Sequence, residues 1–115
     1  MSAKGNQEVL AQITQIQQQL QLVLMQKESI NLQIQEMKYA LKEMEKAKGK
    51  VYKSAGPILI EMDVEEAKQD INAELETLEL KQKSLEKQEK ILKDKLLELR
   101  KKALGGSTTP KGAGA

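Results

Sequence analysis

The sequence predicts a mainly α-helical chain in which two long helices pair as an antiparallel coiled coil and are joined by a short β-hairpin. Of its 115 residues, 31% are charged and only 2% are aromatic, with no Phe or Trp. The large side chains that dominate compact cores are therefore nearly missing. Apolar residues recur at alternating spacings of three and four along two long segments, which is typical of coiled coils. One stretch between these segments, residues 49–62, does not follow a helical pattern.

The first helix is expected over residues 7–48, after a patternless and disordered segment at residues 1–6. Its heptads are apolar at nine of ten seam positions over five repeats, which strongly favours a coiled coil. Gly49 is expected to end this helix, since glycine is common just beyond a helix C-terminus. The a positions are Ile13, Leu20, Lys27, Ile34 and Leu41, and the d positions are Ile16, Val23, Ile30, Met37 and Met44.

A β-hairpin is expected at residues 49–62, because two short runs rich in β-branched and aromatic residues flank a group of turn residues. The runs are 51–53 and 58–62, and the turn residues are 54–57. A lone hairpin is only marginally stable in water, and its apolar strands invite a partner strand. We therefore expect this hairpin to complete its sheet with hairpins of other chains. Pro57 should lie at the first residue of a strand or at an edge, because it lacks an amide donor.

The second helix is expected over residues 63–104, with Asp63 as its N-cap and Glu66 three residues later as in a capping box. Gly105 and Gly106 should stop it, which leaves residues 105–115 as a flexible tail. Every d position is apolar, whereas the a positions are mixed. The d positions are Val64, Ile71, Leu78, Leu85, Leu92 and Leu99, and the a positions are Lys68, Leu75, Gln82, Glu89, Leu96 and Ala103.

Folding the two helices back on each other predicts particular neighbours across the seam. Met44 should lie near Val64, next to the hairpin. Counting outward from there places Lys27 near Gln82 and Leu20 near Glu89. Polar residues at a positions weaken a seam but help to fix its register.

The composition excludes several classes of function. Cys and His are absent, so disulfides, thiolate or imidazole metal sites and the usual nucleophile and proton-shuttle residues are excluded. No Gly-rich phosphate loop precedes a helix. We expect no enzyme activity, no cofactor and no metal. The carboxylates of Asp63, Glu65 and Glu66 are better explained by helix capping than by cation binding.

Charge and hydropathy give no sign of nucleic acid or membrane as a partner. The net charge is +2 with both signs interleaved, and acidic residues interrupt the lysine-rich run at 90–102, which reads as a solvated helix face. Residues 9–26 carry no charge but contain seven glutamines, which are costly in hydrocarbon. No signal peptide is visible, so a cytoplasmic location is expected.

The end of the coiled coil farthest from the hairpin is the most promising binding surface. Apolar residues of both helices gather there, and Leu10, Leu97 and Leu104 fall off the seam, where they should face water. Contiguous exposed apolar groups mark interaction sites, and a charge-free first helix should adapt to varied partners. The alternative is incidental exposure. The candidate binding residues at this end are Val9, Leu10, Ile13, Ile16, Leu97, Leu99, Ala103 and Leu104. Other off-seam apolar residues, such as Leu32 and Leu80, are more simply scattered surface residues, and the alternative is that they widen the apolar wall of a cavity between neighbouring arms.

The segment VYKSAGPILIEM at residues 51–62 closely resembles the hairpin of prefoldin beta subunits, and both flanking helices are similar to that family from about Val9 to Leu104. About a dozen residues separate the helices, which is room for one hairpin and therefore favours the beta type over the two-hairpin alpha type. The resemblance implies a hexamer of two alpha and four beta subunits, in which hairpins form a β-barrel platform. By position, the residues that match the barrel-forming strands are Val51, Tyr52, Ile58, Leu59 and Ile60.

The same resemblance implies an ATP-independent holdase, which captures non-native proteins at the coiled-coil tips and passes them to a group II chaperonin. Two other functions are alternatives. A structural coiled-coil adaptor, or a dimerising tether with one fixed partner, would form a simple dimer. A binder of anionic surfaces through the second helix would depend strongly on salt. Neither alternative explains a sheet-forming hairpin at the centre of the chain.

Overall fold

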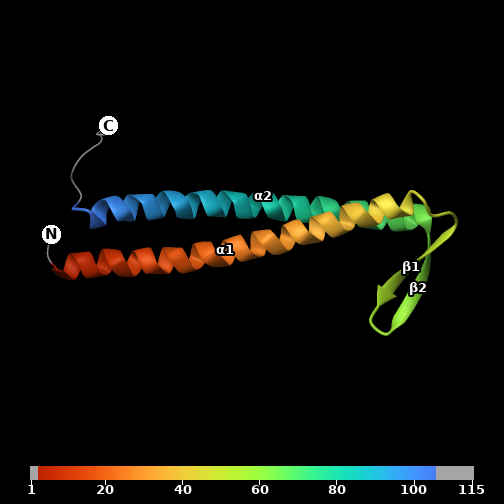
Figure 1. Cartoon of the computed structure of the whole chain (residues 1–115), viewed down its shortest axis with the longest axis horizontal. Coiled ribbons are helices and arrows are strands. Elements are labelled where there is room, and N and C mark those ends of the chain that lie inside the picture. The colour runs from red at the N-terminus through yellow and green to blue at the C-terminus, as the bar shows by residue number, and fades with distance from the viewer. Residues whose placement is uncertain (1–2, 106–115) are drawn as a thin grey trace. The chain divides into compact units, whose positions relative to one another are not determined.

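A computed structural model describes residues 3–105, with side chains from residue 5 onward. Helix α1 spans Ala3–Met44, strand β1 Lys50–Ala55, strand β2 Ile58–Asp63 and helix α2 Val64–Ala103. The strands form one antiparallel two-stranded sheet (Figure 1). The predicted fold class, two long helices with a short β-hairpin between them, is confirmed. No helix within residues 3–105 is both long enough and apolar enough to cross a membrane.

The chain divides into two compact units, and the boundaries fall inside both helices. The hairpin unit comprises residues 28–84 and contains both strands, whereas the terminal unit comprises residues 1–27 and 85–115 and contains both chain ends. In each unit a segment of α1 packs against a segment of α2.

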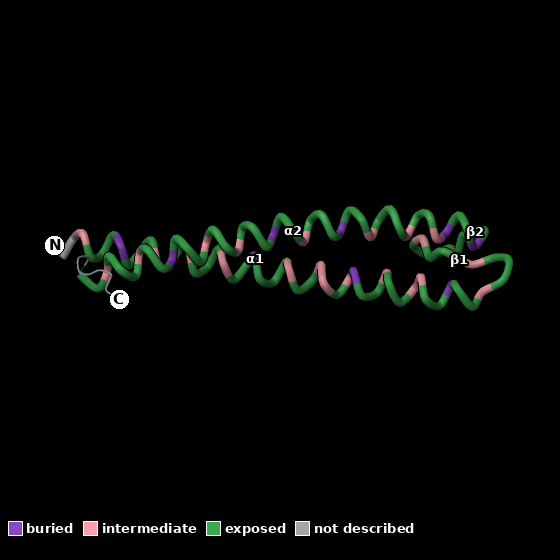
Figure 2. Tube along the Cα trace, turned by 90° about the horizontal axis from the view of Figure 1, so that it is seen from above, coloured by how far each residue is buried: buried purple, intermediate pink, exposed green. Residues whose placement is uncertain are grey.

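The heptad positions are the ones that pack. All the predicted a and d residues are buried or half-buried, and the most buried include Val23 and Ile34 on α1 and Leu78, Leu85 and Leu96 on α2. Figure 2 shows that buried and half-buried residues recur along both helices between longer exposed stretches. Among the described side chains, residues 5–105, none is completely enclosed, which is the expected result of a single seam between two helices.

The ends of the elements differ from the predicted boundaries by a few residues. Residues 3–6 are helical, although the sequence suggested disorder there; residues 1–2 and 106–115, with most of the predicted tail, lie outside the described part of the chain. Helix α1 ends at Met44, four residues before the predicted end at residue 48. Beyond it the amides of Lys46 and Ala47 donate to the carbonyls of Glu43 and Met44, three residues back, which tightens the last turn. Gly49 follows with a φ of 90°, so it marks the change of direction rather than the helix end.

The hairpin is anchored to the helices by a small apolar cluster. Met44, Val64 and Ala67 are buried together, and Leu41, Ala47, Val51, Met62 and Ile71 pack against them. The predicted proximity of Met44 and Val64 is therefore confirmed. The amide of Val64 donates to the carbonyl of Gly49 at 3.1 Å, which ties the start of α2 to the entry of β1.

The turn of the hairpin is tighter than the sequence suggested. Ala55 pairs with Ile58, so only Gly56 and Pro57 form the loop, instead of the four residues expected. Gly56 has a φ of 60°, a left-handed value that suits the first position of a type II′ turn. Pro57 occupies the second position, where its fixed negative φ fits and no strand amide is required.

Candidate functional sites

The strand register divides the hairpin into two faces. Val51–Met62, Lys53–Ile60 and Ala55–Ile58 are paired on one face, which begins at the helix cluster, because Val51 and Met62 pack against it. Lys50–Asp63, Tyr52–Glu61 and Ser54–Leu59 are paired on the opposite face. Of the six residues on the first face, only Val51 and Met62 pack against the helix cluster of this chain. The other four do not belong to that cluster.

Four of the five predicted assembly residues are exposed in the chain. The exposed fractions of Ile58, Leu59 and Ile60 are 58%, 69% and 44%, and that of Tyr52 is 62%. Val51 is half-buried against its own helices. Each strand also has an outer edge without a partner strand within residues 3–105. Apolar side chains on both faces, together with free strand edges, are features of a sheet that pairs with further strands.

Ion pairs hold the base of the hairpin. Lys50 Nζ lies 2.9 Å from Asp63 Oδ1 and 3.7 Å from Glu61 Oε2, so it bridges β1 and β2. The hydrogen bond to Asp63 raises the pKa of Lys50, and the nearby charges of Asp63 and Glu61 add to the effect. Asp63 directly precedes α2, as an N-cap should, but its carboxylate is engaged across the strands.

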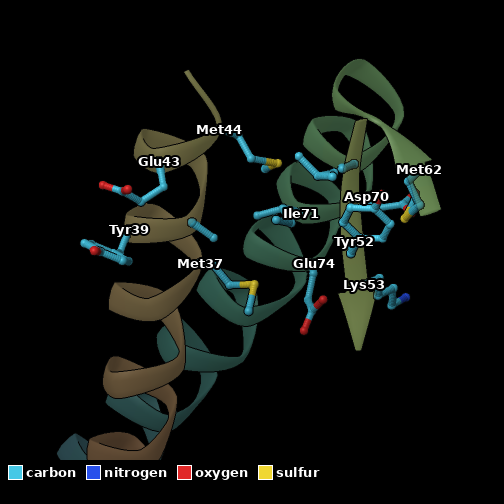
Figure 3. A pocket seen from close by; sticks show the side chains of 13 residues that line it. Met37, Tyr39, Glu43, Met44, Tyr52, Lys53, Met62, Asp70, Ile71 and Glu74 are labelled. Atoms are coloured by element: carbon cyan, nitrogen blue, oxygen red, sulfur yellow. The ribbon is translucent and has the colours of Figure 1, made fainter. Parts of the chain in front are cut away.

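A cavity of about 480 Å³ lies where the hairpin meets the helices. Figure 3 shows side chains of α1, β1 and α2 converging on it, with Met37 and Met44 on one side and Tyr52 and Met62 on the other. Glu43, Asp70 and Glu74 are also among the residues that line it. The cavity is largely apolar and open to solvent, so an apolar side chain could enter it from outside.

The predicted client-binding residues of the terminal unit fall into three classes of exposure. Leu10, Leu97 and Leu104 are 55%, 56% and 86% exposed, which confirms that these three face water. Val9 is buried. The remaining four, which are half-buried, are Ile13, Ile16, Leu99 and Ala103.

One ion pair joins the two helices, and it corrects the predicted register. Lys27 Nζ donates to Glu89 Oε1 at 2.7 Å, whereas the sequence paired Lys27 with Gln82 and Leu20 with Glu89. Leu20 instead lines a groove with Leu96 and Leu97. Side chains lean toward the N-terminus of their own helix, so in an antiparallel pair the side chains of Lys27 and Glu89 lean toward each other. Counting residues along the backbone therefore did not predict the contact between these two side chains.

This pair is the centre of a small network in the terminal unit. Glu89 also accepts Lys93 Nζ at 2.8 Å, one helical turn later. The hydrogen bond from Lys27, followed by the one from Lys93, lowers the pKa of Glu89. The same bond to Glu89 raises the pKa of Lys27, against the opposing effect of burial. Among the described residues it is the single ion pair between α1 and α2.

The groove beside this network is lined by both apolar and charged residues: Leu20 of α1, and Lys93, Asp94, Leu96, Leu97 and Arg100 of α2. The described part of the chain has no group of three carboxylates close enough together to hold a metal ion. The sequence did not reveal the groove, because the groove depends on which residues the two helices bring together.

The comparisons with known proteins agree with this geometry. A family model described as a prefoldin subunit matches residues 7–104. The chain belongs to the prefoldin family. It is similar to the crystal structure of the prefoldin beta subunit from Thermococcus strain KS-1, with a TM-score of 0.82 and 36% identity, over 92% of this chain and 95% of that one. Among curated proteins no match is found.

Membership fixes the general function. The chain is a prefoldin chaperone subunit of the beta type, as the resemblance of residues 51–62 and of both helices predicted. Prefoldin subunits assemble with other prefoldin subunits, and the family is one of chaperones rather than enzymes. The comparisons give no support to the alternative of an adaptor or tether with one fixed partner.

Proposed function

We propose that this chain is one of four beta subunits in a hexamer with two alpha subunits, and that the hexamer is a cytoplasmic, ATP-independent holdase. The hairpins would form a β-barrel platform. The coiled-coil ends would capture non-native proteins and pass them to a group II chaperonin.

The proposed assembly through the hairpin is supported by the exposure of Tyr52, Ile58, Leu59 and Ile60 and by the two unpaired strand edges. A neighbouring strand would satisfy backbone donors and acceptors at an edge and cover these side chains at the same time. The cavity between the hairpin and the helices offers further apolar surface for a neighbour.

The proposed capture of clients is carried by the exposure of Leu97 and Leu104. Leu97 lies in α2 and Leu104 directly follows its last residue, and their spacing of seven residues places both on one side of the helix. One such contact is weak. Several arms on one platform act at high effective concentration, so a client contacted by more than one arm is held much more firmly.

The test is suppression of client aggregation by the complex assembled with an alpha-type subunit. Leu97→Gln with Leu104→Gln should weaken client binding at least about tenfold, because two apolar contacts are lost on every beta arm. Leu32→Gln with Leu80→Gln is the control, because these leucines are also more than half exposed but lie in the hairpin unit. Light scattering of a chemically unfolded enzyme measures protection, and the mass of the complex verifies assembly.

A larger change sharpens the test. Removal of residues 1–12 and 98–115 should abolish protection while leaving the hexamer intact. Full protection by this shortened complex, or equal losses in the leucine variant and its control, would contradict the proposed client site.

A further inference from the structure

The two units of the chain carry opposite net charges. The terminal unit contains ten lysines and arginines against five aspartates and glutamates, whereas the hairpin unit contains nine against twelve. The overall net charge of +2 conceals this difference. The unit with the exposed leucines Leu97 and Leu104 is therefore the basic one.

The excess cations and the exposed leucines share a face of α2. Leu97, Arg100, Lys101 and Leu104 follow the spacing i, i+3, i+4 and i+7, which places them on one side of a helix, and all four are exposed. The amide of Leu104 donates to the carbonyl of Arg100 at 3.1 Å, so Leu104 keeps its helical position just past the end of α2. We call these four residues the basic leucine face.

The two cations of this face are available for a partner. Lys90 is paired with Asp94 and Lys93 with Glu89, but within residues 3–105 no carboxylate lies within ion-pair distance of Arg100 or Lys101. Arg100 also borders the groove that contains Leu20, Leu96 and Leu97. Two unpaired cations thus lie between two exposed leucines and beside a groove lined by three leucines and three charged residues.

We propose that the basic leucine face selects unfolded segments in which acidic residues accompany apolar ones. This inference rests on the proposed capture of clients and specifies their chemistry. Apolar side chains of the segment contact Leu97, Leu104 and the groove, and its carboxylates pair with Arg100 and Lys101. Arginine favours this pairing because its guanidinium can form two parallel hydrogen bonds with one carboxylate. Purely apolar clients still bind, but acidic ones bind more tightly.

The test uses the full-length chain in complex with its alpha-type partner and three labelled unstructured peptides. The peptides have the same apolar residues and differ only in carrying glutamates, lysines or serines at the intervening positions. Fluorescence anisotropy measures their dissociation constants at low and high salt. The acidic peptide should bind most tightly, and high salt should reduce its advantage, because exposed ion pairs are screened.

Arg100→Gln with Lys101→Gln should weaken binding of the acidic peptide roughly threefold to tenfold and leave binding of the serine peptide within about twofold. Lys81→Gln with Lys83→Gln removes the same charge from exposed positions of α2 in the hairpin unit and should have little effect on any peptide. The mass of each complex verifies that assembly is unchanged.

Three results would overturn the inference. Equal affinity for the acidic and lysine peptides would show that the face does not select acidic segments. If Lys81→Gln with Lys83→Gln lowers the affinity for the acidic peptide as much as Arg100→Gln with Lys101→Gln does, the preference is an effect of net charge alone. A DNA duplex that binds this face more tightly than any peptide would assign the cations to nucleic acid. If no peptide binds and no client is protected, the proposed capture itself fails.

Discussion

The hairpin unit and the terminal unit both expose apolar side chains, but on different secondary structures. In the hairpin unit, Leu59 and its neighbours lie on a sheet whose outer edges lack a partner. In the terminal unit, Leu97 lies on a helix whose backbone hydrogen bonds are already made within the helix. A strand edge requires another strand in register, whereas a helix surface accepts partners of varied conformation. Equal apolar exposure therefore suits one unit to a fixed partner and the other to many partners.

The charges sharpen this difference. In the hairpin unit Lys50 is paired with both Glu61 and Asp63 inside the same hairpin, so its charge is already satisfied. In the terminal unit Arg100 and Lys101 have no carboxylate within ion-pair distance among the described residues. In the proposed functions, the specificity of the hairpin unit comes from backbone geometry, and that of the terminal unit comes from long, adaptable cations beside leucines.

The largest expected effect is the loss of assembly when a charge is placed on the exposed sheet. Leu59→Glu should change the stability of the isolated chain little, since an exposed side chain is replaced, typically within about 0.5 kcal/mol. It should nevertheless abolish the hexamer, because the charge would be buried among neighbouring strands. Leu80→Glu, at a similarly exposed position on α2, should leave assembly intact. Native mass spectrometry distinguishes the outcomes, and a hexamer with Leu59→Glu would exclude this face from the interface.

The seam and the sheet were predictable from the sequence because they depend on local periodicity. Apolar residues spaced by three and four residues must share one side of a helix, and β-branched runs beside glycine favour a hairpin. The end of α1 was not predictable. Residues 45–48 are good helix formers, but packing of Ala47 against the Met44 cluster and the turn at Gly49 override that preference.

The candidate sites were predictable only in part. The sequence identified Leu10, Leu97 and Leu104 as exposed because they lie off the heptad positions. It did not reveal the contact of Lys27 with Glu89, because a salt bridge between residues 62 positions apart depends on helix register and side-chain direction. The cavity beside the hairpin also depends on distant segments, from Met37 to Glu74, meeting in space.

A smaller effect is expected at the ion pair between the helices. Glu89→Gln should lower the melting temperature by a few degrees at neutral pH, because Lys27 is left half-buried beside a neutral amide. Since the pKa of Glu89 is lowered in the folded chain, its stabilisation is present above the ordinary pKa of glutamate and is lost as the pH falls through the lowered pKa.

The difference in melting temperature between the wild type and Glu89→Gln should therefore be constant near neutral pH and vanish in acid. Circular dichroism across a pH series, at fixed protein concentration, measures it. Glu98→Gln is the control, because Glu98 lies in the same helix and unit and is exposed. A difference that grows toward acid would refute the role of the ionised Glu89.

The smallest effect concerns the turn of the hairpin. Gly56→Ala should destabilise the chain by about 1 kcal/mol, because alanine is strained at the φ of 60° that Gly56 adopts. Gly56→Asn should be less costly, since asparagine tolerates this conformation better. Chemical denaturation of both variants gives the ranking, and equal stability of the alanine variant and the wild type would argue against the tight turn.

The contrast between the units is tested most directly by photo-crosslinking from three positions in the assembled complex with an unfolded client. A photoreactive residue at position 97 should crosslink to the client, one at position 59 to another subunit, and one at position 80 to neither. The account would be contradicted if positions 59 or 80 gave client adducts as abundant as those from position 97. In that case the chain would not be divided into a hairpin unit for assembly and a terminal unit for client binding.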